Sequence, residues 1–360
     1  MSEKELKNLD NLSNGYTTKK LCRIDNLKTG MKLGKDVVSI DSSFLLAEGT
    51  TITRAHIKHL KALKLNSVYV VDSPCCRSEQ ALSNFEKKYE KIMVSLKLAF
   101  EHVRIFNEVP LAQMQELVDF SINPMIETRG ILECLRKIQK QDCYTYRHSL
   151  NVAIIAGIIG KWCKYQGREL ADLILAGLLH DIGKVQVPVY ILNKPARLTD
   201  GEMQEIRKHP EYGYKLLKEL AVPQKVKMAV LQHHERKDGS GYPKGRTGQE
   251  ICDYAAIIAV ADVYDAMTTT RVYRSKQTPL LAAEVLLEQM YSQLDPYVCN
   301  TFLTYLKNSC IGASVRLSDG QLAWIIHIGQ QKVCRPIVRT ADGQLINLEL
   351  QRNLELLEFI

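Results

Sequence analysis

Between residues 148 and 262, histidines and aspartates stand at the ends of apolar helical segments or inside them. His180 and Asp181 end the apolar run LADLILAGLLHD, and Asp262 lies within AAIIAVADVYDAM. An ionised aspartate inside an apolar helix is strongly disfavoured unless it is paired. An unpaired carboxylate or imidazole at a buried helix end is also costly. The chain must therefore fold so that these side chains meet a partner that satisfies them.

Other histidines in the same stretch suggest that the shared partner is a metal. His148 opens an apolar helix, His209 precedes Pro210, and His233 and His234 form a second unusual pair. Mixed imidazole and carboxylate ligation suits iron, manganese or zinc better than calcium or magnesium. One metal cluster explains all of these positions, whereas structural roles would need a separate reason for each. The predicted ligands are His148, His180, Asp181, His209, His233, His234 and Asp262.

Composition favours a globular protein that binds a small anion. The chain has 46% hydrophobic and 24% charged residues, which is ordinary for a soluble domain. Its formal net charge is +8, but the basic residues form no long tract. Duplex binding usually needs a concentrated basic face. We therefore expect a small anionic ligand and no nucleic acid polymer.

The sequence also bears on location. The longest strongly apolar stretches, 150–160 and 255–261, are shorter than the ~20 residues that span a bilayer. The N-terminal residues lack the apolar segment of a secretory signal. Ten cysteines without a CxxC pair are expected to be reduced thiols. We predict a cytoplasmic protein with no membrane insertion.

Hydrophobic periodicity predicts a mainly α protein. Apolar residues at three- and four-residue spacing indicate helices through 125–310 and an amphipathic helical stretch over 78–122, which Pro110 and Pro124 punctuate. Period-two alternation near both ends indicates strands, with turns at 318–320 and 341–343. The predicted parts are a flexible tail (1–20), a small α+β domain (21–74), a helical connector (75–124), a helical bundle (125–310) and a small β-rich subdomain (311–360).

Five segments, in order, resemble the HD-GYP domain, the cyclic di-GMP phosphodiesterase branch of the HD metal-dependent phosphohydrolases. They are DCYTYRHSLNV at 142–152, HDIGKVQVP at 180–188, KHPEYGYKLL at 208–217, HHERKDGSGYPKG at 233–245 and AVADVYDAMTTTRVYR at 259–274. Residues 21–73 are similar, through GMKLGKDVV and LLAEGTTIT, to a small domain that accompanies some HD-GYP proteins. The β-rich tail is similar to a C-terminal extension in such proteins. The resemblance implies an HD-type helical bundle.

The resemblance implies two divalent metal ions, iron or manganese. One is held by His148, His180, Asp181 and Asp262, and the other by Asp181, His209, His233 and His234. Some family members hold a third metal with a glutamate four residues before the first histidine. That position is Tyr144 here, so two metals are predicted. The implied reaction is hydrolysis of cyclic di-GMP to pGpG, with onward hydrolysis to GMP left open, by attack of a metal-bridging hydroxide.

Several further residues are predicted to bind substrate. Lys184 follows His180 by four residues, so a continuing helical turn would place it on the same face for the scissile phosphate or the water network. Arg271 and Arg274 suit bidentate contacts to phosphate or a guanine edge. Val272 stands where the family usually has proline, which leaves this loop less rigid. Tyr273 would stack on a base or pack against the protein.

The glycine-rich loop 239–243 is the segment that gives the family its name. Its glycines permit unusual backbone shapes, Pro243 fixes one dihedral, and Asp238 is expected to anchor it by hydrogen bonds. The resemblance implies a lip at the substrate entrance, with Tyr242 near the substrate. It also implies contacts with diguanylate cyclase (GGDEF) domains.

Alternatives remain open at this level. The substrate could be another cyclic dinucleotide such as 3′,3′-cGAMP. The chain could also be a signalling module that binds a cyclic dinucleotide without hydrolysing it. Such a module is expected to have lost metal ligands, but all seven predicted ligands are present here. For 78–122, a homodimer interface and a plain intramolecular helix both fit the pattern.

Overall fold

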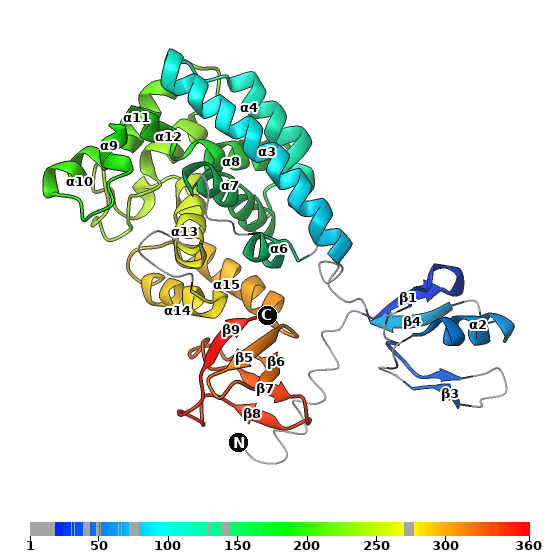
Figure 1. Ribbon diagram of the computed structural model, residues 1–360. Helices are drawn as coiled ribbons and strands as arrows, with labels where there is room; N and C mark the ends of the chain where they lie inside the picture. The colour runs from blue at the N-terminus through cyan, green and yellow to red at the C-terminus, as the bar shows by residue number, and fades with distance from the viewer. Residues whose placement is uncertain are drawn as a thin grey trace. The chain divides into compact units, whose positions relative to one another are not determined.

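A computed structural model of the chain describes most of its residues in two compact units, 1–81 and 82–360 (Figure 1). The described residues are 19–29, 31, 33–38, 44–47, 50, 52–63, 65, 67–71, 79–128, 130–138, 144–269 and 277–360.

The N-terminal unit is a small α+β structure. Its two antiparallel strand pairs are β1 (Lys19–Arg23) with β4 (Ser67–Val71), and β2 (Val37–Val38) with β3 (Phe44–Leu46). A short 3-10 helix, η1 (Ile24–Asn26), follows β1. Helix α2 (Arg54–Ala62) is capped by Thr53, which accepts a hydrogen bond from the His56 amide. Leu33, Ile52 and Leu60 are fully buried in its core.

The second unit is mainly helical. Its helices are α3 (Glu79–Phe106, which begins at the boundary), α4 (Leu111–Leu117), the π-helix η3 (Val118–Ile122), α5 (Asn123–Met125), α6 (Ile131–Lys137), α7 (Tyr144–Trp162), α8 (Gly167–Leu179), η4 (Ile182–Gln186), α9 (Val189–Leu192), α10 (Asp200–Ile206), α11 (His209–Leu217), α12 (Gln224–Gln232), η5 (Gly248–Glu250), α13 (Asp253–Thr268), α14 (Pro279–Gln289) and α15 (Pro296–Cys310). The amphipathic stretch predicted over 78–122 is not one helix, because α3 ends at Phe106 and Pro110 precedes α4.

Helices α7, α8 and α13 form the centre of this unit. Helix α7 packs against both α8 and α13. Every residue of α8 from Leu170 to Leu179 is buried. A helix that is apolar on all sides is stable only when neighbours cover it completely. Four of the predicted ligands, His148, His180, Asp181 and Asp262, therefore stand on these central helices or directly after them.

A five-stranded antiparallel sheet ends the chain. Its strand order is β8-β7-β6-β5-β9. The strands are β5 (Ser314–Leu317), β6 (Leu322–His327), β7 (Ile337–Thr340), β8 (Leu345–Asn347) and β9 (Leu356–Phe359). The predicted fold class, mainly α with a small α+β domain and a β-rich C-terminal part, is confirmed.

Candidate metal centre

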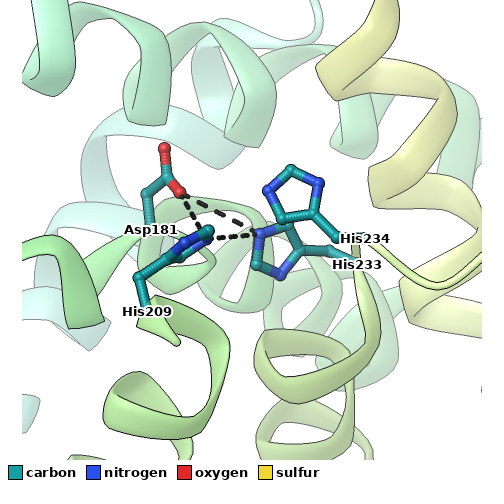
Figure 2. A group of neighbouring side chains, drawn as sticks. All are labelled: Asp181, His209, His233 and His234. Atoms are coloured by element: carbon teal, nitrogen blue, oxygen red, sulfur yellow. Dashed lines mark hydrogen bonds and ion pairs between the residues drawn. The ribbon is translucent and has the colours of Figure 1, made fainter. Parts of the chain in front are cut away.

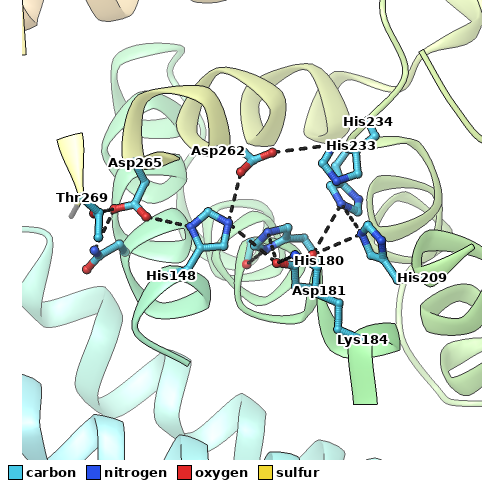
Figure 3. Close-up of polar contacts among 12 residues, drawn as sticks. His148, His180, Asp181, Lys184, His209, His233, His234, Asp262, Asp265 and Thr269 are labelled. Carbon is cyan, nitrogen blue, oxygen red and sulfur yellow. Dashed lines mark hydrogen bonds and ion pairs between the residues drawn. The ribbon is translucent and has the colours of Figure 1, made fainter. Parts of the chain in front are cut away.

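The structure brings all seven predicted ligands together from helices α7, α11 and α13 and from the segments that directly follow α8 and α12 (Figure 3). They form two neighbouring groups, one of Asp181, His209, His233 and His234, the other of His148, His180 and Asp262. His234 is half-buried and the other six side chains are buried. Segments more than a hundred residues apart in sequence thus contribute to one enclosed polar cluster.

Asp181 lies between the two groups, with one oxygen toward each. Its Oδ2 is 3.3 Å from His180 Nε2 and 3.7 Å from His148 Nε2. Its Oδ1 is 3.2 Å from His209 Nε2 and 3.9 Å from His233 Nε2. Figure 2 draws these contacts in the group of Asp181, His209, His233 and His234. This is the placement that a carboxylate needs to bridge two cations.

Asp262 also contacts both groups. Its Oδ1 is 3.1 Å from His148 Nε2, and its Oδ2 is 3.8 Å from His234 Nδ1. The two buried carboxylates therefore stand among five imidazoles.

Backbone hydrogen bonds fix how three of the imidazoles point. Nδ1 of His180, His209 and His233 lies 2.8, 2.7 and 2.8 Å from the carbonyl oxygen three residues earlier in the chain. A carbonyl oxygen can only accept, so each Nδ1 carries the proton. In the neutral ring Nε2 then bears a lone pair, and it faces the cluster. This is the tautomer of a metal-binding histidine whose other nitrogen is anchored.

The cluster has lone pairs facing one another without enough protons to join them. His209 Nε2 and His233 Nε2 are 3.2 Å apart, although both Nδ1 atoms already hold the ring protons. Among the described residues, His180 Nε2 and Asp181 Oδ1 are buried without a hydrogen-bond partner. Buried polar atoms left in this way cost free energy. A divalent cation in each group would satisfy them, so the residues fit a metal centre.

The pKa shifts of the cluster residues favour the protonation states that metal ligands need. Burial lowers the pKa of His209, and holds the pKa values of His233 and His234 well below the ordinary value. Burial alone would raise the pKa of Asp181, but Lys184 and His180 outweigh it and hold that pKa well below the usual range. The group of Asp181, His209, His233 and His234 thus offers neutral imidazoles and an ionised carboxylate.

His148 differs from the other histidines. Burial lowers its pKa, but hydrogen bonds to Asp262 and Asp265 outweigh burial and raise the pKa to about 9. Its Nδ1 lies 2.7 Å from Asp265 Oδ2, so its Nε2 also faces the cluster.

A close backbone contact brings Asp181 and His209 together. A Cβ added to Gly183 would lie 2.0 Å from the His209 carbonyl oxygen and 2.4 Å from the Gly213 nitrogen. Real Cβ atoms are not found at such distances, so only glycine lets η4 lie directly on α11. The ligand that follows α8 can therefore reach the ligand that opens α11.

Lys184 reaches the site by a different route from the one predicted. Helix α8 ends at Leu179 and the chain continues as the 3-10 helix η4, so the helical turn expected after His180 does not continue. Lys184 Nζ nevertheless lies 2.6 Å from Asp181 Oδ2 and is 25% exposed. It is paired with Asp181 and still reachable from solvent.

The loop 239–243 is held against the cluster. The Tyr242 ring stacks on His234, with ring centroids 4.6 Å apart, and the Arg207 guanidinium lies 5.4 Å from the Tyr242 centroid. A Cβ on Gly241 would lie 2.4 Å from the Arg236 nitrogen. Asp238 accepts hydrogen bonds from the Ser240 amide and hydroxyl. Tyr242 therefore forms part of the wall of the site.

Some predicted residues cannot be placed, and others were not predicted. Arg271, Tyr273 and Arg274 lie outside the described residues. Sequence reasoning missed two buried acids. Glu235 accepts hydrogen bonds from the Lys244 and Arg246 amides and so anchors the glycine-rich loop. Asp265 supports His148, and its position three residues after Asp262 in the same apolar helix was an available signal.

A buried histidine–aspartate cluster inside a helical bundle defines the class of protein. Residues 134–298 match the family model described as HD domain. Residues 134–298 are therefore assigned to the HD domain family, and the resemblance of this part of the chain to the HD-GYP branch is confirmed.

The curated relatives are named as cyclic-dinucleotide phosphodiesterases. Cyclic di-GMP phosphodiesterase PA4108 of Pseudomonas aeruginosa is 34% identical over 243 residues, which cover 67% of this chain and 58% of the relative. 3′3′-cGAMP-specific phosphodiesterase 3 of Vibrio cholerae is 32% identical over 170 residues, 46% of this chain and 37% of the relative. The chain thus spans less than two thirds of the length of either relative.

A solved structure shares the fold. The HDG"Y"P protein Bd1817 of Bdellovibrio bacteriovorus aligns with a TM-score of 0.51 and 19% identity, over 80% of this chain and 99% of that one. This likeness supports the HD-type bundle. Within the described part of the chain, none of the helices combines the length and apolar character needed to cross a membrane.

Proposed function

We propose that the chain is a metal-dependent phosphodiesterase that hydrolyses cyclic di-GMP to pGpG. The observation that carries the proposal is the set of buried Nε2 lone pairs facing the two oxygens of Asp181. The names of the relatives support the substrate class, because they cover cyclic di-GMP and 3′3′-cGAMP.

The seven side chains would hold two divalent cations, iron or manganese. His148, His180 and Asp262 would bind one, His209, His233 and His234 the other, and Asp181 would bridge them. When bound, such cations lower the pKa of water and neutralise charge that develops on the phosphoryl oxygens. The protein's part is to aim the imidazoles and to keep both carboxylates ionised.

Two residues at the edge of the cluster would bind the substrate. Lys184 carries a positive charge beside Asp181 and is partly exposed, so its ammonium group can contact a phosphodiester oxygen. Tyr242 covers His234 and can limit the entry of water on that side. Arg271 and Arg274 are proposed phosphate or guanine contacts, on the ground of the sequence alone.

Two other functions lead to different results. A relative named for 3′3′-cGAMP makes that dinucleotide the second candidate substrate. An inactive binding module would bind the ligand and release no product.

The full chain, purified anaerobically and supplied with Mn²⁺ or Fe²⁺, is to be incubated with cyclic di-GMP, 3′,3′-cGAMP and cyclic di-AMP. We expect pGpG from cyclic di-GMP. Binding of a cyclic dinucleotide without release of product would contradict the proposed phosphodiesterase activity.

Substitution of the bridging carboxylate tests the mechanism. Asp181→Asn keeps the shape of the side chain but removes the charge between the two groups, so hydrolysis should fall at least about a thousandfold. Asp319→Asn, in the exposed turn before Gly320, is the matched control and should leave the rate unchanged. An Asp181→Asn protein that hydrolyses cyclic di-GMP at near the wild-type rate would refute the mechanism.

Partner proteins remain proposals. Helix α3 exposes Val94, Leu98 and Ile105, at 61%, 64% and 70%. In an antiparallel pair centred on residue 96, Val94 would oppose Leu98, and Lys91 would oppose Glu101 of the second copy. We propose a homodimer through this face. The molecular mass in solution should halve in Leu98→Glu, and a monomeric wild-type chain would contradict the proposal.

Contact between loop 239–243 and diguanylate cyclase domains is proposed from the family resemblance alone.

A further inference from the structure

A chain of hydrogen bonds leaves the metal cluster from the far side of His148 (Figure 3). Nδ1 of His180, His209 and His233 each donates to a backbone carbonyl three residues earlier. His148 Nδ1 instead contacts the Asp265 side chain, which comes from α13. The direction of the His148 ring therefore depends on a tertiary contact.

The series of hydrogen bonds continues from Asp265 to α3. Asp265 Oδ1 accepts hydrogen bonds from Asn151 Nδ2 at 2.7 Å and from Thr269 Oγ1 at 3.0 Å. Asn151 Oδ1 in turn accepts from the Tyr89 hydroxyl at 2.7 Å. The carboxylate can only accept, so the Asn151 amide nitrogen must face it, and the amide oxygen must face Tyr89. The direction of donation is thus fixed for every hydrogen bond from Tyr89 to Asp265.

The four main members of this chain are sealed from solvent. Tyr89, Asn151, Asp265 and His148 are 1%, 3%, 2% and 4% exposed. Water cannot readily replace a lost partner at such positions, so each group depends on its neighbour. Tyr89 lies on α3, and its contact with Asn151 joins positions 62 residues apart in sequence.

We propose that Tyr89 is a positioning residue for the metal ligand His148, acting through Asn151 and Asp265. The proposal rests on the proposed function, since it needs the cluster to bind metal. Without the Tyr89 hydroxyl, the Asn151 amide oxygen loses its buried donor, and the amide can turn away from Asp265. Asp265 then holds His148 less firmly. Outer partners of metal-bound histidines set ring orientation in this way.

The proposal predicts an effect on one cation of the two. Only the group of His148, His180 and Asp262 contains a ligand aimed through α3. His209 and His233 are aimed by Ile206 and Val230, in their own segments of the chain. A merely structural role for Tyr89 would lower overall stability and affect both sites alike.

The test is a Mn²⁺ titration of the metal-free full chain, by calorimetry and by competition with a chelator. Wild type should bind two ions. Tyr89→Phe should weaken one of the two sites by about tenfold and leave the other within about twofold. In ¹⁵N-histidine NMR spectra of the metal-free protein, the His148 signals should shift, and those of His209 and His233 should not.

Tyr254→Phe is the matched control, because Tyr254 is also buried and its hydroxyl donates to the Glu169 carbonyl, outside the network. Both of its Mn²⁺ sites should match wild type. If Tyr89→Phe does not fold, judged by circular dichroism, Asn151→Ser breaks the same chain and must show the same selective loss. Wild-type affinities at both sites in the folded variant would overturn this inference alone. A wild-type chain that binds no Mn²⁺ would overturn the proposed function as well.

Discussion

Single residues decide whether the cluster can form, and Gly183 is one that does so without any functional group. Its α-carbon lies so close to α11 that the space for a side chain is filled by the His209 carbonyl. The contact sets where Asp181, two residues earlier, stands relative to His209. Packing of η4 on α11 and the geometry of the proposed metal site therefore depend on the same backbone contact.

Gly183→Ala should cost at least about 2 kcal/mol of unfolding free energy, because backbone atoms must move to admit the methyl group. It should also weaken Mn²⁺ binding, since Asp181 and His209 are displaced. Gly201→Ala is the control, because nothing lies within 4 Å of its added Cβ. Urea denaturation of both variants measures the difference. Equal midpoints would show that the close contact is not required.

The sequence indicated the seven clustered residues because ionisable groups in apolar helices need an explanation. The same reasoning could have marked Asp265, which is also buried in α13, but not its role, since it contacts the outer nitrogen of His148 and the amide of Asn151. Glu235 could not be found in this way. Its partners are backbone amides nine and eleven residues later, and no side-chain pattern records them.

At the scale of helices, the sequence located most segments, but not how the chain leaves them. The spacing of His180 and Lys184 suggested one continuing turn. The chain instead forms η4, whose tighter winding and contact with α11 at Gly183 depend on a helix that comes later in the sequence. Periodicity describes a helix, whereas its end is set by tertiary contacts. Lys184 reached the cluster all the same, through Asp181.

The contribution of Asp295, at the start of helix α15, to the stability of the fold should depend on pH. Asp295 caps it by accepting from the Val298 amide at 3.0 Å, and pairs with Lys237 at 2.5 Å. Burial raises the pKa of Asp295, but Lys237 and the Val298 amide outweigh burial and lower it overall. A carboxyl group with a lowered pKa stabilises the fold above its unfolded pKa, and that contribution is lost as pH falls through the folded pKa.

Asp295→Ala should therefore lower the unfolding free energy by about 1 kcal/mol at pH 7. Below about pH 4 the difference from wild type should shrink as the carboxyl group takes up a proton. Thermal unfolding at pH 7, 5 and 3.5 checks this. A difference that stays constant with pH would mean that the charge of Asp295 contributes nothing.

At the scale of the whole molecule, the two compact units divide the chain close to the start of α3. Change of hydrophobic period along the sequence predicted where strands give way to helices, because a strand buries alternate residues and a helix buries every third or fourth. It could not predict that Tyr89 of α3 would contact Asn151 of α7. That contact depends on how helices pack.

A chain that begins at residue 79 should fold and bind Mn²⁺ like the full protein, because it keeps α3 and all seven cluster residues. A chain that begins at residue 107 loses Tyr89 with the rest of α3, and exposes the helices that α3 covers. It should unfold at a lower temperature and bind Mn²⁺ more weakly. Calorimetry on both chains measures this. Equal Mn²⁺ affinity in the shorter chain would show that α3 does not support the cluster.

We expect the imidazoles and carboxylates of the cluster to hold two cations. The decisive experiment is metal quantification on protein purified without oxygen, for the wild-type chain and for Asp181→Asn. The wild-type chain should carry two iron or manganese ions, and the variant clearly fewer. A wild-type chain that carries no metal after incubation with Fe²⁺ or Mn²⁺, or a variant that keeps both ions, would contradict this expectation.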